Sequence, residues 1–364
     1  MRSQKIRLKL TKEQERLAWW YSKVSRNFWN LLVDIDKRNN KGEFDEILKK
    51  NGNKTYHSKF YDREVYKLNQ SDYHKLAKIV VTKNYNEDKD KWSWYYQPNQ
   101  SFIYKHLSRE LIKIRIQNKG RLNFRSVNKI QPNFNVRCDI SSDKKRLSRI
   151  YLKKSGKLQI PTIGDVSFGS VRKEFNLSSK KQVANISFDG KYWYLSYTED
   201  VENQIIDLPN YTDGLGIDLG IKTLVTVSDG TTVPNIKTFR KVRILNKRLK
   251  RLQSKVSRKY LINKCNKHNK TKNIIKLERR IKLIHRSLKN IRINHIRKFV
   301  SELVKKQPQY IAIEDLNVKG MMRNKHLAKD IANCSFYTIK EHIIRKAKER
   351  NIVVRLVDRF YPSS

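Results

Sequence analysis

The sequence predicts a multidomain α/β protein, in which a small antiparallel β domain carries an inserted helical lobe and precedes a mixed sheet with a long helical hairpin. Three observations predict it. Helical periodicity follows the first ten residues, residues 120–200 form short alternating runs separated by Gly turns, and apolar strands alternate with basic helical stretches from residue 206 onward. A chain of 364 residues has room for two or three domains.

The charge balance limits the function classes. The chain has 81 Lys and Arg against 34 Asp and Glu, a net charge of +47 spread over its whole length. Such a distribution favours a large nucleic-acid interface over one small basic patch. No run approaches the roughly 18–20 apolar residues of a membrane span, and charges near the start replace the apolar region of a signal peptide. We therefore expect a cytoplasmic protein with no membrane partner.

The three cysteines point the same way. Cys138, Cys265 and Cys334 are far apart and form no CxxC pair. We therefore expect neither a disulfide framework nor a cysteine-rich zinc site. The absence of a disulfide framework suits a protein of a reducing compartment.

The N-terminal third predicts one strand and a helical lobe. Residues 3–10 alternate like a strand that could complete the later β domain. A long helix follows with Thr11 as N-cap, and its apolar positions recur at three- and four-residue steps: Leu17, Tyr21, Val24, Phe28 and Leu31. Residues 39–100 place aromatic rings among lysines, which suits base stacking or, more simply, the core of the lobe. A second helix is predicted over about 101–117.

Residues 120–200 predict an antiparallel β domain. Its short alternating runs are separated by turns at Ser155-Gly156 and Asp189-Gly190. A small barrel or a sandwich would accommodate this pattern.

The stretch from about 240 to 304 predicts two antiparallel helices. Their apolar faces are marked by Leu245, Leu249, Leu252 and Val256, and by Leu277, Ile281, Ile284, Leu288 and Ile291. Between Arg240 and Val300 there are 23 Lys or Arg and a single acid, Glu278. Because like charges three or four residues apart oppose a helix, we expect phosphate groups to neutralise this hairpin, with a solvated surface as the alternative.

Two acidic residues, each on a predicted strand, are candidate site residues. In GLGIDLGIKTLVTVSDG, residues 214–230, Asp218 is expected in the middle of an apolar strand, where a carboxylate is exposed, paired or bound to a cation. Glu314 ends the strand QYIAIEDL, and a helix over about 326–348 and the strand NIVVRLVD follow. This order suits an RNase H-like sheet, in which carboxylates from separate strands converge on Mg²⁺.

The C-terminal motifs also carry a family resemblance. GIDLGIKTLVTVSDG, IAIEDLNVKGMMRNKHLAKDIANCSFYTIKEHI and VVRLVDRFYPSS closely resemble the TnpB (OrfB) family of transposon-encoded RNA-guided proteins, relatives of the type V CRISPR effectors. The resemblance is clear from about residue 206 onward and fainter before it. Asp218 matches the family's first catalytic Asp and Glu314 its catalytic Glu, the pair that would bind Mg²⁺.

The resemblance implies a domain layout and partners. A wedge-like β-barrel would comprise residues 1–10 and 120–205, an inserted helical recognition lobe residues 11–119, and a RuvC (RNase H-like) domain residues 206–364. The implied partners are a guide RNA and double-stranded target DNA with a short adjacent motif, in a bacterial, nucleoid-associated protein.

The family pattern departs from this sequence at its end. In the family, a segment like RFYPSS runs into a zinc ribbon with paired CxxC motifs and a third catalytic Asp, whereas this sequence ends at Ser364. Asp358 belongs to the DRFYPSS motif and is not a substitute. We therefore expect a RuvC domain that lacks its C-terminal part, with no zinc site, Mg²⁺ bound weakly if at all, and Asp218 and Glu314 vestigial.

Three functions remain open at this point. The first is an RNA-guided DNA-binding transcriptional repressor without cleavage, like the nuclease-dead TldR relatives of TnpB. The second is an Mg²⁺-dependent RNA-guided DNA endonuclease whose end is missing from this sequence. The third is a general basic RNA-binding protein.

One helix is a candidate reader of the target-adjacent motif. Gln100, Tyr104 and Lys105 occupy roughly the position that the family uses for this purpose. Gln can bond adenine edges and Lys can reach guanine, although a plain helix surface is the alternative interpretation.

Overall fold

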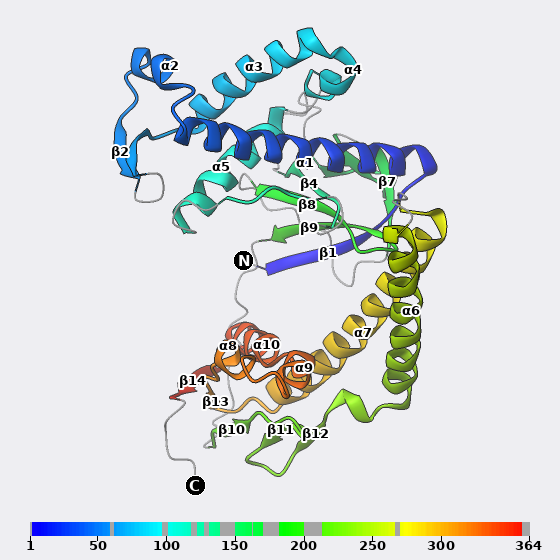
Figure 1. Ribbon diagram of the computed structural model, residues 1–364. Coiled ribbons are helices and arrows are strands. Elements are labelled where there is room, and N and C mark those ends of the chain that lie inside the picture. Colours follow the sequence, from blue (N-terminus) through cyan, green and yellow to red (C-terminus); the bar gives the residue numbers. More distant parts are fainter. Residues whose placement is uncertain are drawn as a thin grey trace. The chain divides into compact units, whose positions relative to one another are not determined.

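The computed structural model describes most of the chain, namely residues 2–58, 62–96, 101–117, 122–126, 131–138, 150–161, 163–169, 182–199, 213–265 and 270–358. The chain forms two compact units, Met1–Val201 and Glu202–Ser364, which we describe separately (Figure 1). Within the described ranges, no helix combines the length and the apolarity needed to cross a membrane.

Unit 1 contains a seven-stranded antiparallel sheet. In spatial order its strands are β4 (Asn133–Cys138), β8 (Gln182–Phe188), β9 (Trp193–Glu199), β1 (Arg2–Lys9), β7 (Gly164–Phe168), β6 (Leu158–Ile160) and β5 (Tyr151–Leu152). The first six residues of β1 pair with β9 and its last two with β7. The expected closed barrel is not seen in the described residues, because the strand order has two free ends, β4 and β5.

Helices cover this sheet and form the rest of unit 1. They are α1 (Lys12–Asn40), α2 (Asp45–Lys50), α3 (Gln70–Glu87), α4 (Lys89–Trp92), a 3₁₀ turn (Ser93–Tyr95) and α5 (Ser101–Gln117), with a small hairpin of β2 (Thr55–Ser58) and β3 (Arg63–Tyr66). Helix α1 begins at a capping box, in which the Gln14 amide donates to Thr11 Oγ1 (3.2 Å) and the Thr11 amide to Gln14 Oε1 (3.1 Å).

The apolar stripe of α1 differs from expectation at one position. Tyr21, Val24, Phe28 and Leu31 are buried, but Leu17 is 42 % exposed. The first turns of α1 present the neighbouring Ala18 to the core instead, and Ala18 is fully buried.

A buried polar cluster links three helices of unit 1. The carboxylate of Asp36 on α1 lies 3.0 Å from the Arg115 guanidinium on α5, and the Tyr73 hydroxyl on α3 donates to it at 2.7 Å. Burial raises the pKa of Asp36, while Arg115 and the hydrogen bonds from Tyr73 and Asn40 lower it by less. Mutual pairing therefore offsets only part of the cost of taking the Asp36 carboxylate out of water.

Unit 2 is built on a five-stranded mixed sheet. Its spatial order is β12 (Thr232–Pro234), β11 (Thr223–Val227), β10 (Leu215–Asp218), β13 (Tyr310–Glu314) and β14 (Val353–Val357). Strands β10, β13 and β14 are parallel to one another, whereas β10, β11 and β12 are joined antiparallel. Gly230, with φ of +84°, lies in the turn between β11 and β12.

Among the described residues, the helices of unit 2 lie between its strands in the sequence, two of them between β12 and β13 and three between β13 and β14. They are a 3₁₀ turn (Ile236–Thr238), α6 (Arg240–Cys265), α7 (Lys272–Lys305), α8 (Val318–Met321), α9 (Ala328–Cys334) and α10 (Phe336–Lys348). Helices α7, α9 and α10 lie on one side of the sheet (Figure 1), where Phe299, Ile339 and Ile343 are buried in the same core as Ile311 and Ile313.

The helix expected over about 326–348 is two helices. They are separated at Ser335, which adopts a left-handed conformation with φ of 56°. The break is supported by the Ser335 hydroxyl, which bonds to the Ala332 carbonyl (3.3 Å) and accepts from Arg292 (3.4 Å).

Candidate nucleic-acid interface

The two candidate acids lie at the same edge of the sheet in unit 2. Strand β10 ends at Asp218 and its parallel neighbour β13 ends at Glu314. Their register pairs Ile217 with Ile313, so Asp218 and Glu314 follow as the next neighbours, on the face opposite to those buried side chains. The expectation that Asp218 lies mid-strand is wrong. It is the last residue of its strand and its side chain is exposed, at the carboxyl edge where open α/β sheets bind ligands.

Local sequence explains how Asp218 is presented. The Ser228 hydroxyl accepts from the Gly216 amide (3.0 Å), and the Ser228 amide donates to the Gly216 carbonyl (2.9 Å), which ties β10 to the end of β11. Beyond Asp218 the chain turns sharply at Gly220, where an added Cβ would lie 2.6 Å from the Thr223 carbonyl oxygen. A glycine is therefore needed there to let the chain turn beside the acid.

The acid that follows Glu314 in the sequence has partners. Asp315, which follows Glu314, pairs with Lys340 of α10 at 2.6 Å, and its amide donates to the Val357 carbonyl (3.0 Å). Nothing in the sequence marks Lys340 beyond its place on an amphipathic helix.

The donor set suits one hard cation. In the part of the chain that the structure describes, no group of three or more His, Cys, Asp or Glu side chains could hold a metal ion. Asp218 and Glu314 nonetheless supply two oxygen donors that water can reach. The chemistry of this donor pair is that preferred by Mg²⁺, which commonly keeps several waters and takes one or two carboxylates.

The long hairpin of α6 and α7 presents a dense basic surface. The helices pack along a seam of apolar residues that includes Val242, Ile284 and Leu288. All ten Lys and Arg side chains between Arg240 and Lys259 are exposed. Paired charges cannot neutralise them within α6, because this segment contains no acid. The hairpin can therefore contact many phosphates of a nucleic acid.

One acid near each end of α7 is paired with a lysine. Glu278 pairs with Lys270 and accepts from the Tyr260 hydroxyl at 2.5 Å. Burial raises the pKa of Glu278, but the hydrogen bonds from Lys270 and Tyr260 lower it by more. At the other end, Lys306 donates to Asp229 at 2.5 Å, and this bond is the main cause that lowers the pKa of Asp229 to about 2.

The candidate motif-reading residues have different surroundings. Gln100 lies outside the described residues, and Lys105 is exposed on α5. Tyr104, by contrast, is a core residue: its ring stacks on Phe28 (centroids 4.0 Å apart) and on Tyr95 (5.1 Å), and its hydroxyl donates to the Tyr95 carbonyl (3.1 Å). Only 7 % of Tyr104 is exposed, so its side chain is not presented to a base in this structure.

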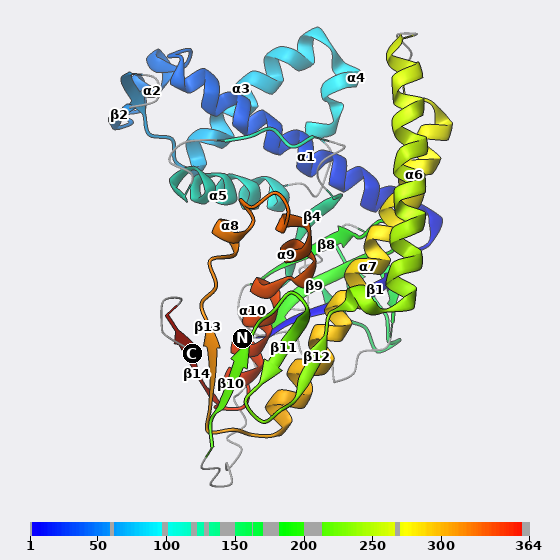
Figure 2. The same cartoon turned by 60° about the horizontal axis from the view of Figure 1, so that its bottom comes forward.

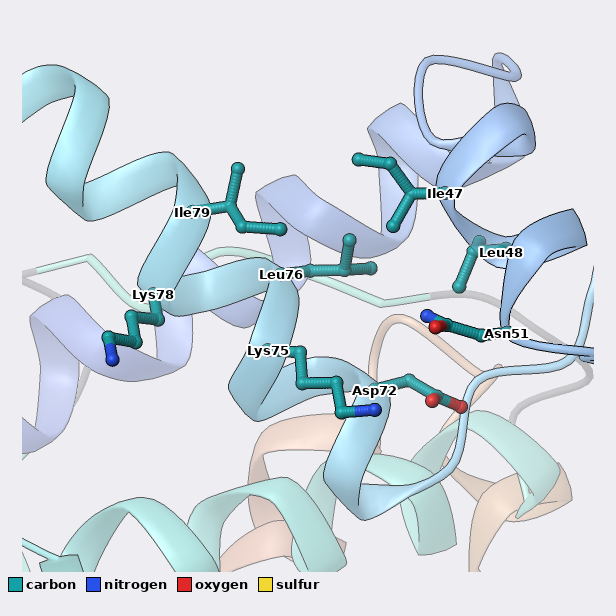
Figure 3. A pocket seen from close by; sticks show the side chains of 8 residues that line it. All are labelled: Ile47, Leu48, Asn51, Asp72, Lys75, Leu76, Lys78 and Ile79. Carbon is teal, nitrogen blue, oxygen red and sulfur yellow. The ribbon is translucent and has the colours of Figure 1, made fainter.

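Unit 1 has a pocket that is separate from these features. It has a volume of about 340 Å³ and lies between α2 and α3, as Figure 3 shows. Its lining is Ile47, Leu48, Asn51, Asp72, Lys75, Leu76, Lys78 and Ile79. The Asp72 carboxylate is used within the protein, since it accepts from Asn53 Nδ2 (2.7 Å) and from the Asn69 amide (2.8 Å).

Comparison with known proteins relates the acidic edge to one family. The family model OrfB_IS605, described as "Probable transposase", matches residues 196–325, a stretch that contains Asp218 and Glu314.

Two curated proteins are similar over part of their length. A "Putative RNA-guided DNA endonuclease" of Streptomyces pristinaespiralis is 30 % identical over 172 residues, which cover 47 % of this chain and 39 % of that protein. The "Putative RNA-guided DNA endonuclease InsQ" of Escherichia coli (strain K12) is 32 % identical over 134 residues, which cover 36 % of this chain and 30 % of that protein. The chain thus spans well under half the length of these relatives.

Two solved structures align with nearly the whole chain at low similarity. A Cas12f1–sgRNA–target DNA complex gives a TM-score of 0.42 at 12 % identity, covering 98 % of this chain and 89 % of the other. A CRISPR-Cas12f ternary complex gives 0.30 at 13 % identity, covering 99 % and 89 %.

Proposed function

We propose that this chain is a member of the TnpB (OrfB) family, and that it is an RNA-guided DNA-binding protein that represses transcription without cutting its target. The observation that carries the proposal is the placement of Asp218 and Glu314 in adjacent register at the carboxyl edge of a mixed sheet. We take this sheet, with its order β12-β11-β10-β13-β14, as a RuvC (RNase H-like) domain.

The proposed partners are a guide RNA and double-stranded DNA that carries a short motif beside the target. The names of the relatives support the RNA guide, and the exposed lysines and arginines of α6 support extensive phosphate contact. In such systems base pairing reads the target sequence, while the protein reads duplex shape and the short motif. Gln100 and Lys105 remain candidates for that motif.

The number of acids at this edge favours DNA binding without DNA cleavage. When bound, one Mg²⁺ held by Asp218 and Glu314 would polarise a phosphate oxygen. The two-metal arrangement that stabilises both the attacking and the leaving oxygen needs more ligands than two carboxylates supply. Asp218 and Glu314 then contribute mainly a local negative charge at the edge of the sheet.

Two other functions compete with this one. An RNA-guided DNA endonuclease is favoured by the names of the relatives and requires a further carboxylate from residues outside those described. A general basic RNA-binding protein is favoured by the net charge of +47 alone and leaves the adjacent register of Asp218 and Glu314 unexplained.

RNA that co-purifies with the full chain provides the test. Sequencing should show one discrete RNA species, from which a matched and a scrambled DNA duplex are made. Wild type, Asp218→Ala and the control Glu314→Gln should all prefer the matched duplex with similar affinity, and none should yield a cut product with Mg²⁺. Equal affinity for both duplexes would support general RNA binding. Specific cutting that Asp218→Ala abolishes would establish the endonuclease instead.

A further inference from the structure

One face of the sheet in unit 2 is open in the described residues. Ile217, Ile311 and Ile313 point into the core beneath the helices and are at most 6 % exposed. Their neighbours along the strands point the other way and are half-buried or exposed, among them Ala312 and Arg355. Figure 2 shows β10, β13 and β14 side by side, and the open face is the one that also carries the two acids.

An arginine is held in place on this face. The guanidinium carbon of Arg355 lies 4.1 Å from the ring centroid of Tyr310, in a cation–π contact across β14 and β13. The Tyr310 ring is itself fixed against Gly214, because a Cβ at that position would lie 2.0 Å from the ring. The backbone just before β10, a ring on β13 and a guanidinium on β14 thus form one stack.

The stack leaves the hydrogen-bonding fork of Arg355 available. Arg355 is exposed, and the structure gives it no carboxylate partner among the described residues. A planar guanidinium with a fixed orientation loses little freedom when it binds an anion, and its paired donors match phosphate geometry.

The position of Arg355 relates it to the acids. Arg355 lies opposite Ala312, and Val357 lies opposite Glu314, two residues further along the same strands. At about 3.3 Å per residue, the row that contains Arg355 is roughly 7 Å behind the row that contains Glu314 and Asp218.

We propose that Arg355 is a binding residue, which contacts a phosphate of a nucleic-acid strand on the open face, beside Asp218 and Glu314. This inference rests on the proposed function, since it specifies where the strand runs on the same site. Tyr310 serves as the support that orients the guanidinium.

Salt titration of strand binding tests the proposal. The full chain with its co-purified RNA is titrated with a fluorescein-labelled 20-nucleotide single-stranded DNA at several salt concentrations. Losing one phosphate contact in Arg355→Gln should lower the affinity and reduce the slope of log K against log salt by about 0.7. Arg355→Lys keeps the charge and should restore the slope, and Tyr310→Phe keeps the ring and should behave as wild type.

A second readout locates the strand. With 5-iodouracil in the same oligonucleotide, ultraviolet cross-linking and mass spectrometry should find the peptide that contains Tyr310. The inference would be overturned if the salt slope of Arg355→Gln equalled that of wild type, or if all cross-links lay elsewhere. Guided binding to the matched duplex would still stand in either case. A wild-type chain without discrete RNA and without preference for the matched duplex would overturn the proposed function as well.

Discussion

Gly214 has a specific role because the ring of Tyr310 occupies the space that a side chain at this position would need. We predict that Gly214→Ala displaces the ring and destabilises the protein by about 1–3 kcal/mol, the usual cost of overpacking. Urea denaturation measures the change. Gly216→Ala is the matched control, since its new Cβ would meet the Ser228 side chain at 3.7 Å, an ordinary contact. An equal loss in both variants would mean that the Tyr310 ring is not responsible, since backbone propensity alone favours Ala over Gly.

The ion pair between Asp229 and Lys306 predicts a pH dependence. The folded-state pKa of Asp229 is lowered to about 2, chiefly by the hydrogen bond from Lys306, while an unfolded Asp titrates near 3.9. The stabilisation is therefore complete above pH of about 4 and is lost as the pH falls towards 2. Asp229→Asn keeps an oxygen for the Thr231 amide and should remove this part of the pH profile. Lys306→Met should do the same, and a profile unchanged in both variants would contradict the prediction.

Residue types and their order were enough to predict that the two acids lie on separate strands of one mixed sheet. The structure adds that β10 and β13 are parallel neighbours, in a register that brings Asp218 beside Glu314. The environment of Tyr104 could not be predicted in the same way. An aromatic residue near lysines looks the same in sequence whether its ring is exposed or stacked between Phe28 and Tyr95, because the partners come from distant segments.

The turn between α10 and β14 determines where Arg355 lies. Asn351, three residues after the end of α10, adopts the left-handed conformation with φ of 56°, and the Ile352 amide donates to the Ala347 carbonyl (3.0 Å). Asn tolerates this conformation and Ala does not, so we predict that Asn351→Ala destabilises the protein by about 1 kcal/mol. Asn351→Gly should be neutral or slightly stabilising in the same thermal unfolding measurement. A loss with Gly as large as with Ala would point to a contact of the Asn side chain.

Elements with local signals were predicted well, and elements that depend on distant contacts were not. The helix expected over about 101–117 is α5, because its periodicity and length lie within one segment. The break at Ser335 had no Gly or Pro to mark it, and it is supported by Arg292 from α7, more than forty residues away. The β domain shows the same limit, since alternation predicts strands but does not show whether the first and last of them meet.

The net charge of +47 governs the molecule as a whole. In the absence of RNA, repulsion among these charges opposes the compact state, and added salt screens it over about 10 Å at 0.1 M. We predict that the melting temperature of nuclease-treated protein rises as sodium chloride increases from low concentration, and rises further with a polyanion such as heparin. Protein that retains its RNA is the control and should respond less. A melting temperature that is independent of salt would contradict the prediction.

The pairing of β1 with β9 also affects the timing of synthesis. Arg2 pairs with Glu199, so a strand in the middle of the sheet of unit 1 meets this partner only after nearly two hundred further residues have been made. At about 5–20 residues per second, that delay on the ribosome is on the order of ten to forty seconds. The helices of the lobe can pack around Tyr73 and Phe28 during this time, whereas β1 leaves the exit tunnel without a partner. The nascent chain therefore exposes an unpaired strand that a chaperone can hold until β9 emerges.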